Sequence, residues 1–339
     1  MKEILLSLSR GQDLTEEQAR MMMERMMNGS ATAVETTAYL TLLAQKGETV
    51  QEIYGSASAM RRFSVSLQTS GVILDTCGTG GDHSGSFNIS TAAAIVAAAG
   101  GCKVAKHGNR AASSQTGSAD VLAALGVPLD LTPEQSSACL EDVGFCFLFA
   151  QSYHPAMKHV APIRRELGYR TVFNMLGPLT NPARPDVQVI GAPSPDIAHK
   201  LAHALALLGT RHALVVHSQD GLDELSVSAP TRVYEVLNDR VRTFDTSPAE
   251  VGLSIYGPEQ IKGGDAAYNA DLIRSIFHGR RGAPREIVAF NAGAALYVCD
   301  KAQDLRDGVQ MACELIDSGA AADALDRIAH RHAREAVSA

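Results

Sequence analysis

A glycine-rich segment, DTCGTGGDHSGSFNIST from Asp75 to Thr91, stands between the apolar stretch 71–75 and the alanine-rich stretch 90–100. Glycines let a backbone approach a ligand closely, and the N-terminus of a following helix offers unpaired N–H groups. This combination predicts a loop that holds an anion such as a phosphate. The loop is neither a Walker loop, because no Lys-Ser/Thr pair closes it, nor a GxGxxG loop. Asp82 would repel a phosphate, so we expect it to bind sugar hydroxyls or to orient the loop.

A second polar loop, KHGNRAASSQTGSAD from Lys106 to Asp120, follows another apolar stretch and precedes a helical one. It carries the cations Lys106 and Arg110 and several hydroxyl groups on small residues. Many hydrogen-bond donors with little bulk match a polyanion such as a diphosphate. Because both loops follow strands, we expect them to lie at the same edge of one sheet.

A pair of adjacent acids, Asp223 and Glu224, follows the apolar stretch 212–218. Such a pair on its own favours an exposed acidic turn. Beside a diphosphate the two carboxylates would be repulsive unless a divalent cation lay between them. Mg²⁺ is commonly held by one or two carboxylates, substrate phosphate oxygens and water. Together with the two loops, the pair therefore predicts a magnesium site.

A basic segment, from His154 to Pro182, begins with an expected helix and ends in a turn rich in glycine and proline. The helix carries His154, Lys158, His159, Arg164 and Arg165. Arg164 has the fork geometry to pair with a carboxylate, although an arginine on a helix is more often only solvated.

The elements that must position these residues alternate between strand and helix patterns from residue 71 onward. The apolar stretches 71–75, 102–108 and 145–150 indicate strands, and the stretches 188–192, 212–218 and 286–298 continue the series. Alternation of this kind predicts an α/β fold with a mostly parallel central sheet, in which ligands bind at the carboxyl ends of the strands. The segment 231–248 reads as an inserted β-hairpin that turns at Asn238-Asp239.

The first 66 residues show helical spacing of apolar residues instead. Helices are expected within 14–29, 31–47 and 49–63, the first with Thr15 and Gln18 as a capping box. Short helices bury little apolar area alone, so this block must pack on the rest of the chain or on a second subunit.

Composition excludes several classes of protein. The chain has 339 residues, 30 basic and 37 acidic residues and a net charge of −7, which argues against nucleic-acid binding through bulk charge. The six cysteines show no CxxC spacing, so we expect reduced core residues and no zinc site. No signal-peptide pattern and no membrane-length apolar segment is evident, which predicts a cytoplasmic protein without membrane contacts.

Five segments, in order, resemble those of the anthranilate phosphoribosyltransferases: DTCGTGGD, FNIST, KHGNR with GSADVL, HPAMKHVAPIRRELGYRTVFNMLGPLTNP and DGLDELS. The resemblance covers essentially the whole chain. It implies transfer of the phosphoribosyl group of 5-phosphoribosyl 1-pyrophosphate to the amine of anthranilate, giving N-(5-phosphoribosyl)anthranilate and pyrophosphate in tryptophan biosynthesis. It also implies two Mg²⁺ ions and a homodimer joined through the N-terminal helical domain.

The resemblance implies a nucleoside phosphorylase-type phosphoribosyltransferase fold, in which a small N-terminal helical domain is hinged to a large α/β domain. The helical domain would span 1–68, with 155–190 returning to it. The α/β domain, which binds phosphoribosyl pyrophosphate, would span 69–154 and 191–339.

The resemblance assigns site residues position by position. Phosphoribosyl pyrophosphate contacts would come from Gly78, Gly81, Asp82, Ser86, Asn88, Ile89, Ser90, Thr91, Lys106, His107, Gly108, Asn109, Arg110, Ala111, Ala112, Ser113, Ser114 and Ser118. Anthranilate contacts would come from Gly78, Asn109, His154, Arg164 and Gly177, and Mg²⁺ ligands from Ser90, Asp223 and Glu224.

The residue types suit the chemistry of this transfer. Displacement of pyrophosphate at the anomeric carbon passes through an oxocarbenium-like state, which needs neutralisation of the leaving group and alignment of the amine. Lys106 and Mg²⁺ would supply the first, and Asn109 and Arg164 the second. Either His107 or His154 is a candidate general base.

Two rival functions remain open at this point. A pyrimidine nucleoside phosphorylase of the same fold is disfavoured by the acid pair and the KHGNR loop. A non-catalytic nucleic-acid-binding relative is disfavoured by the negative charge and by the presence of the expected site residues.

Overall fold

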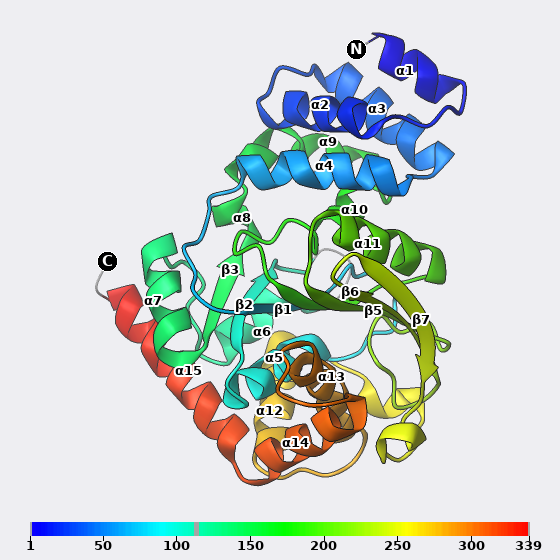
Figure 1. The fold of residues 1–339 in the computed structure, drawn as a ribbon. Coiled ribbons are helices and arrows are strands. Elements are labelled where there is room, and N and C mark those ends of the chain that lie inside the picture. Colours follow the sequence, from blue (N-terminus) through cyan, green and yellow to red (C-terminus); the bar gives the residue numbers. More distant parts are fainter. Residues whose placement is uncertain (1, 112–114, 338–339) are drawn as a thin grey trace.

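The computed structural model describes residues 2–111 and 115–337, and its centre is a seven-stranded sheet (Figure 1). The strand order is β3-β2-β1-β4-β5-β6-β7, with β1 to β5 parallel and the last two strands antiparallel. The strands are β1 (Ile73–Gly78), β2 (Lys103–Gly108), β3 (Phe145–Phe149), β4 (Val187–Gly191), β5 (His212–Ser218), β6 (Thr231–Leu237) and β7 (Arg240–Thr246). The predicted mostly parallel sheet is confirmed, and so is the hairpin that turns at Asn238.

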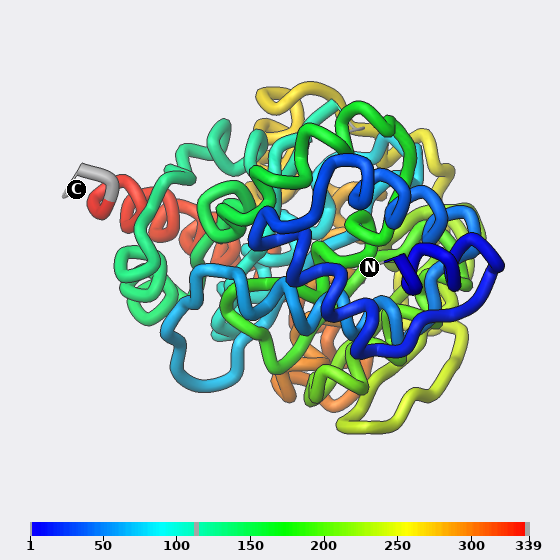
Figure 2. Tube along the Cα trace, turned by 90° about the horizontal axis from the view of Figure 1, so that it is seen from above, coloured from blue at the N-terminus to red at the C-terminus, as the bar shows by residue number. Residues whose placement is uncertain are grey.

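The N-terminal block folds as four helices above this sheet: α1 (Lys2–Ser9), α2 (Glu16–Met27), α3 (Ala33–Lys46) and α4 (Val50–Phe63). Capping boxes on Thr15, Thr32 and Thr49 start the last three of them. The predicted helical N-terminus is therefore confirmed. Figure 2 shows these helices lying over the chain near residues 150–210.

A later part of the chain returns to this block. Its short helices are α8 (Ala150–Tyr153), η1 (Pro155–His159), α9 (Ala161–Leu167) and α10 (Phe173–Leu176). η1 contacts α2, α9 contacts α3, and α10 contacts α4. One apolar core joins the two sets of helices to one face of the sheet through Ile190 and Val215.

Helices cover both faces of the sheet. The face toward the N-terminal block also carries α11 (Pro195–Leu207), and α7 (Pro133–Val143) covers the same side near β3. The opposite face is covered chiefly by α5 (Ile89–Ala99) and α13 (Ala283–Val298). The remaining elements on that side are α6 (Ser118–Ala124), η2 (Ala249–Val251), η3 (Pro258–Ile261), α12 (Ala266–Phe277), α14 (Leu305–Asp317) and α15 (Ala320–Val337).

Two predictions about elements were wrong. The stretch 286–298 is not a strand but part of the helix α13. Its length and its four alanines suit a helix. Its single glycine, Gly293, lets the backbone of α14 come so close that a Cβ there would lie 2.5 Å from Val309 N. The expected helix from His154 to Arg165 is divided into η1 and α9, because Pro155 and Pro162 each begin a new helical segment.

All six cysteines are free, and none of the helices within 2–111 and 115–337 combines the length and apolar character needed to cross a bilayer.

Glu235, a buried acid on β6, forms hydrogen bonds with residues on both neighbouring strands, β5 and β7. These bonds predict that the stability of the fold decreases at acidic pH. The carboxylate of Glu235 accepts hydrogen bonds from His212 Nε2 and Tyr297 Oη, both at 2.8 Å, and from Arg242. Burial alone would raise the pKa of Glu235, but these bonds lower it from 4.5 to about 2. The lowered pKa stabilises the fold above pH 4.5, and this contribution disappears as the pH falls toward 2.

We expect the contribution to be about 2 kcal/mol, less than the full shift implies because Arg242 is largely exposed and solvent screens its charge. Denaturant unfolding of Glu235→Gln at pH 3 and pH 6 measures it. The free energy of unfolding of the variant should fall less between pH 6 and pH 3 than that of the wild type. An equal fall in both proteins would contradict this role.

Candidate active site

Several predicted site residues lie at the carboxyl ends of β1 and β4, where the order of the parallel strands reverses. Gly78 ends β1, and a Cβ on it would lie 2.6 Å from the carboxylate of Asp223. Gly191 ends β4, and a Cβ on it would lie 1.6 Å from the carbonyl oxygen of Asp223. Both strand ends therefore need glycine, because only glycine lets the chain at Asp223 reach the sheet edge.

The first loop, residues 79–86, is tied to this acid. Gly80 N donates to Asp223 Oδ2 at 3.1 Å, so the glycine loop and the acid pair form one unit. Asp82 accepts a hydrogen bond from Ser84 N, while its other oxygen, Oδ2, is buried without a partner among the described residues. The Ser86 hydroxyl accepts a bond from the Ser84 hydroxyl at 3.2 Å.

The N-cap and the first turn of α5 carry four predicted site residues, Asn88, Ile89, Ser90 and Thr91. Ser90 N donates to Glu224 Oε1 at 3.2 Å. The Ser90 hydroxyl also lies 3.4 Å from Lys106 Nζ, whose ammonium donates to the carbonyl oxygen of Thr76 as well. Ser90, Lys106 and Glu224 thus converge beside the end of β1, although they lie far apart in the sequence.

The electrostatics of this cluster favour a cation. Burial and the nearby Asp82 carboxylate raise the pKa of Asp223 to about 7, and burial and Asp223 raise the pKa of Glu224 well above its usual range. These acids repel one another and are only partly offset by Lys106, which is 1% exposed. Burial lowers the pKa of Lys106, and the charge of Asp75 opposes that shift.

The second loop begins at the end of β2 and is held by an acid on the following helix. Asp120 accepts hydrogen bonds from Ala111 N and Gly117 N, both at 3.0 Å, and pairs with Arg110. Ser118 Oγ donates to the carbonyl oxygen of Asn109, whose side chain is exposed. A Cβ on Gly108 would lie 2.2 Å from Ser118 Oγ, so the two ends of the loop touch. The predicted contacts Ala112, Ser113 and Ser114 lie outside the described residues.

The two candidate bases form a buried pair. The rings of His107 and His154 are 5.1 Å apart, and His107 Nδ1 lies 3.2 Å from the carbonyl oxygen of Gly177. Burial lowers the pKa of His107 to about 3, helped by His154, and burial lowers the pKa of His154 to about 4. Both rings are neutral at pH 7 and are weak bases, so the structure favours neutral hydrogen-bonding roles over proton removal.

Arg164, on α9, is an arginine without an acidic partner in the part of the chain that the structure describes. Its guanidinium lies 4.9 Å from the ring centre of Phe173, and burial lowers its pKa. A partly buried, unpaired guanidinium is suited to bind an incoming carboxylate.

Sequence reasoning missed residues that hold the two loops in place. Arg170 Nη1 donates to the carbonyl oxygens of Gly80 and Gly81 at 3.1 and 3.4 Å. Behind the loops, the buried Asp75 accepts hydrogen bonds from His107 N and from Asn181 Nδ2. Asp75 and Asn181 stand in the segments that carried the resemblance, but their spacing in the sequence gives no sign that they meet.

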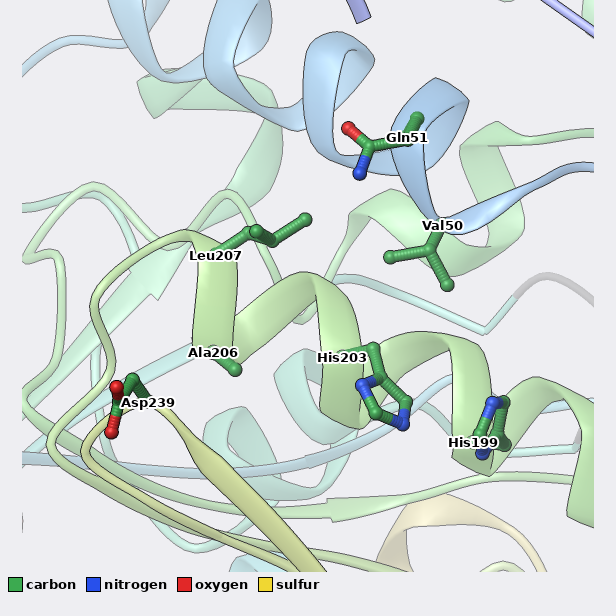
Figure 3. A pocket seen from close by; sticks show the side chains of 7 residues that line it. All are labelled: Val50, Gln51, His199, His203, Ala206, Leu207 and Asp239. Atoms are coloured by element: carbon green, nitrogen blue, oxygen red, sulfur yellow. The ribbon is translucent and has the colours of Figure 1, made fainter.

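A separate groove of about 430 Å³ lies away from these residues, between the N-terminal end of α4, the helix α11 and the β6–β7 turn (Figure 3). It is lined by Val50, Gln51, His199, His203, Ala206, Leu207 and Asp239. None of these is a predicted site residue, so the groove adds nothing to the site at the strand ends.

Comparison with known proteins matches both parts of the chain. Residues 70–322 match the glycosyl transferase family, a/b domain, and residues 2–64 match its helical bundle domain. An anthranilate phosphoribosyltransferase of Symbiobacterium thermophilum is 50% identical over 329 residues, which is 97% of this chain and 96% of that protein.

Solved structures agree. The anthranilate phosphoribosyltransferase of Thermus thermophilus is 44% identical, with a TM-score of 0.92 over 97% of this chain and 99% of that chain. That of Saccharomyces cerevisiae, solved with phosphoribosyl pyrophosphate and magnesium, is 27% identical, with a TM-score of 0.88 over 98% of this chain and 99% of that chain.

These relatives are named for transfer to anthranilate and not for nucleoside phosphorolysis or nucleic-acid binding, so neither rival function is supported. The chain belongs to the anthranilate phosphoribosyltransferase family and is a phosphoribosyl-transferring enzyme of tryptophan biosynthesis.

Proposed function

We propose that the strand-end cluster binds phosphoribosyl pyrophosphate and that the region around Asn109 and Arg164 binds anthranilate. The observation that carries this proposal is the convergence of Lys106, Ser90 and the Asp223-Glu224 pair at the end of β1. The two loops add backbone N–H groups and small polar side chains on either side of it.

The residues present fit Mg²⁺. Asp223 and Glu224 are repelling carboxylates, and Asp82 has a buried oxygen without a partner among the described residues. Within the described residues no group of three or more His, Cys, Asp or Glu side chains forms a metal site, but Mg²⁺ needs only one or two carboxylates when substrate phosphates complete its shell. Ser90, Asp223 and Glu224 would hold it, and two ions are proposed. When bound, Mg²⁺ supplies positive charge to the diphosphate.

Different residues of the chain would then stabilise the leaving group and bind anthranilate. Lys106 and the N–H groups at the start of α5 stabilise the negative charge that grows on the departing pyrophosphate. Arg164 binds the carboxylate of anthranilate, and Asn109 orients its ring. The amine of anthranilate is uncharged at pH 7 and attacks the anomeric carbon, and it releases a proton afterwards. His107 and His154 stay neutral and shape the anthranilate pocket beside Gly177.

We propose the division into a helical domain, 1–68 with 155–190, and an α/β domain, 69–154 with 191–339. The contacts of η1, α9 and α10 with the N-terminal helices support this division. A homodimer through the helical domain would cover exposed apolar side chains on its first three helices, Leu6, Met21 and Val34. The activity in tryptophan biosynthesis is consistent with a cytoplasmic location.

Arg164→Ala tests the proposed anthranilate site. We expect the KM for anthranilate to rise about 10- to 100-fold, because hydrogen bonds to a charged group contribute about 1.5–3 kcal/mol. The KM for phosphoribosyl pyrophosphate should change little. Steady-state kinetics with each substrate varied in turn measures both constants. Arg165→Ala is the matched control, because Arg165 is the exposed neighbour on the same helix. An unchanged anthranilate KM in Arg164→Ala would remove Arg164 from the site.

A further inference from the structure

A third segment, which none of the site assignments includes, lies against both ligand loops. It runs from the end of η3 into α12. Gly263 N donates to the carbonyl oxygen of Gly85 at 2.9 Å, and Phe87 N donates to that of Ile261 at 3.2 Å. On its other side, the Thr116 hydroxyl of the second loop donates to the carbonyl oxygen of Gly264 at 2.8 Å. The segment therefore touches both walls of the proposed phosphoribosyl pyrophosphate site.

Two side-chain amides, the buried Asn269 and the half-buried Asn88, connect the same three segments through a series of hydrogen bonds. Gly264 N donates to Asn269 Oδ1 at 2.8 Å, and Asn269 Nδ2 donates to Asn88 Oδ1 at 3.0 Å. Asn88 Nδ2 then donates to the carbonyl oxygen of Thr116 at 3.1 Å. The series of hydrogen bonds starts at the backbone N–H of Gly264, which can only donate, and ends at the carbonyl oxygen of Thr116, which can only accept. Both amides therefore have one possible orientation, because rotating either would place like groups against each other.

The position of Asn88 connects this series of hydrogen bonds to the proposed ligand site. Asn88 is the N-cap residue of α5, where an asparagine oxygen normally accepts a bond from an N–H of the first turn. Here it makes no such bond, because its side chain is held by Asn269 and Thr116. A released Asn88 oxygen would compete with an anionic ligand for the first-turn N–H groups of α5.

We propose that Asn269 is a positioning residue that aligns the first loop, the second loop and the N-terminus of α5 for phosphoribosyl pyrophosphate. Its side chain, on a residue only 2% exposed, acts through Asn88 and does not touch the substrate itself. The proposal rests on the proposed function, since it assigns the diphosphate sugar to this edge of the sheet.

Asn269→Asp tests the proposal with the smallest change of shape. The carboxylate keeps the acceptor for Gly264 N but loses the donor to Asn88 Oδ1. We expect the KM for phosphoribosyl pyrophosphate to rise roughly 5- to 30-fold, as for a buried acceptor left without its donor. The KM for anthranilate should change at least fivefold less, and thermal unfolding should show folded protein at the assay temperature. Asn238→Asp is the matched control, because it makes the same chemical change at the exposed β6–β7 turn.

Thr116→Val is a second variant in case Asn269→Asp does not fold. It removes the other link between the second loop and Gly264, and it should raise the same KM roughly two- to fivefold. Equal changes in both KM values, a lower kcat with unchanged KM values, or no change would each overturn the proposal. A wild-type protein that forms no phosphoribosylanthranilate would refute the proposed function instead, whatever the variants do.

Discussion

Lys106→Ala should lower kcat/KM for phosphoribosyl pyrophosphate by about 10²–10³, the usual loss when one charge-stabilising donor is removed. Lys106 is buried beside Ser90, and the charge of its ammonium opposes the rise in the pKa of Glu224. Its removal leaves the growing charge of pyrophosphate less well stabilised. Initial rates at varied phosphoribosyl pyrophosphate, with anthranilate saturating, measure the loss.

Two further variants separate charge from packing in this test. Lys106→Met keeps most of the buried stem and removes only the charge, so it should lose nearly as much activity as the alanine variant. Lys103→Ala changes a lysine on the same strand whose ammonium bonds to Ser70 and Glu141 at the surface, and it should keep wild-type kinetics. Wild-type use of phosphoribosyl pyrophosphate by Lys106→Met would contradict the electrostatic role.

The double variant Asp223→Asn with Glu224→Gln should need at least about 10- to 100-fold more Mg²⁺ for half-maximal activity. Mutation of groups that only hydrogen-bond to metal ligands typically lowers metal affinity or activity about 10- to 100-fold. Removing the charges of the ligands themselves should therefore lower Mg²⁺ affinity at least as much. The same variant should unfold at an equal or higher temperature than the wild type in EDTA. The reason is that the neutral amides remove the repulsion that raises the pKa of both acids.

Activity titrated with Mg²⁺ and thermal unfolding in EDTA measure the two effects separately. Asp220→Asn is the control, because Asp220 is exposed in the same loop and bonds to Ser226. A wild-type Mg²⁺ titration in the double variant would contradict the metal site, and a strongly lowered unfolding temperature would show a structural role instead.

Local signals in the sequence predicted the elements that carry the site. Apolar stretches followed by glycines predicted β1, β2 and β5, and the Thr15-Gln18 capping box predicted the start of α2. Periodicity could not separate a buried strand from a buried helix in the apolar stretch 286–298, which is why α13 was misassigned.

Contacts between distant residues were beyond such reasoning. Asn269 and Asn88 are 181 positions apart, and their hydrogen bond depends on the packing of α12 against α6, the helix that follows the second loop. Arg170 reaches the glycine loop from the segment that follows α9, 89 positions from Gly81. The sequence contains these residues but no local pattern that distinguishes them from solvated polar side chains.

The most direct test of the central claim is the fluorescence of anthranilate in the presence of the folded protein. Addition of phosphoribosyl pyrophosphate with Mg²⁺ should cause a time-dependent loss of anthranilate fluorescence, with equimolar release of pyrophosphate. Omission of Mg²⁺ or of phosphoribosyl pyrophosphate should abolish the loss. Unchanged fluorescence with both present and the protein folded would contradict the account.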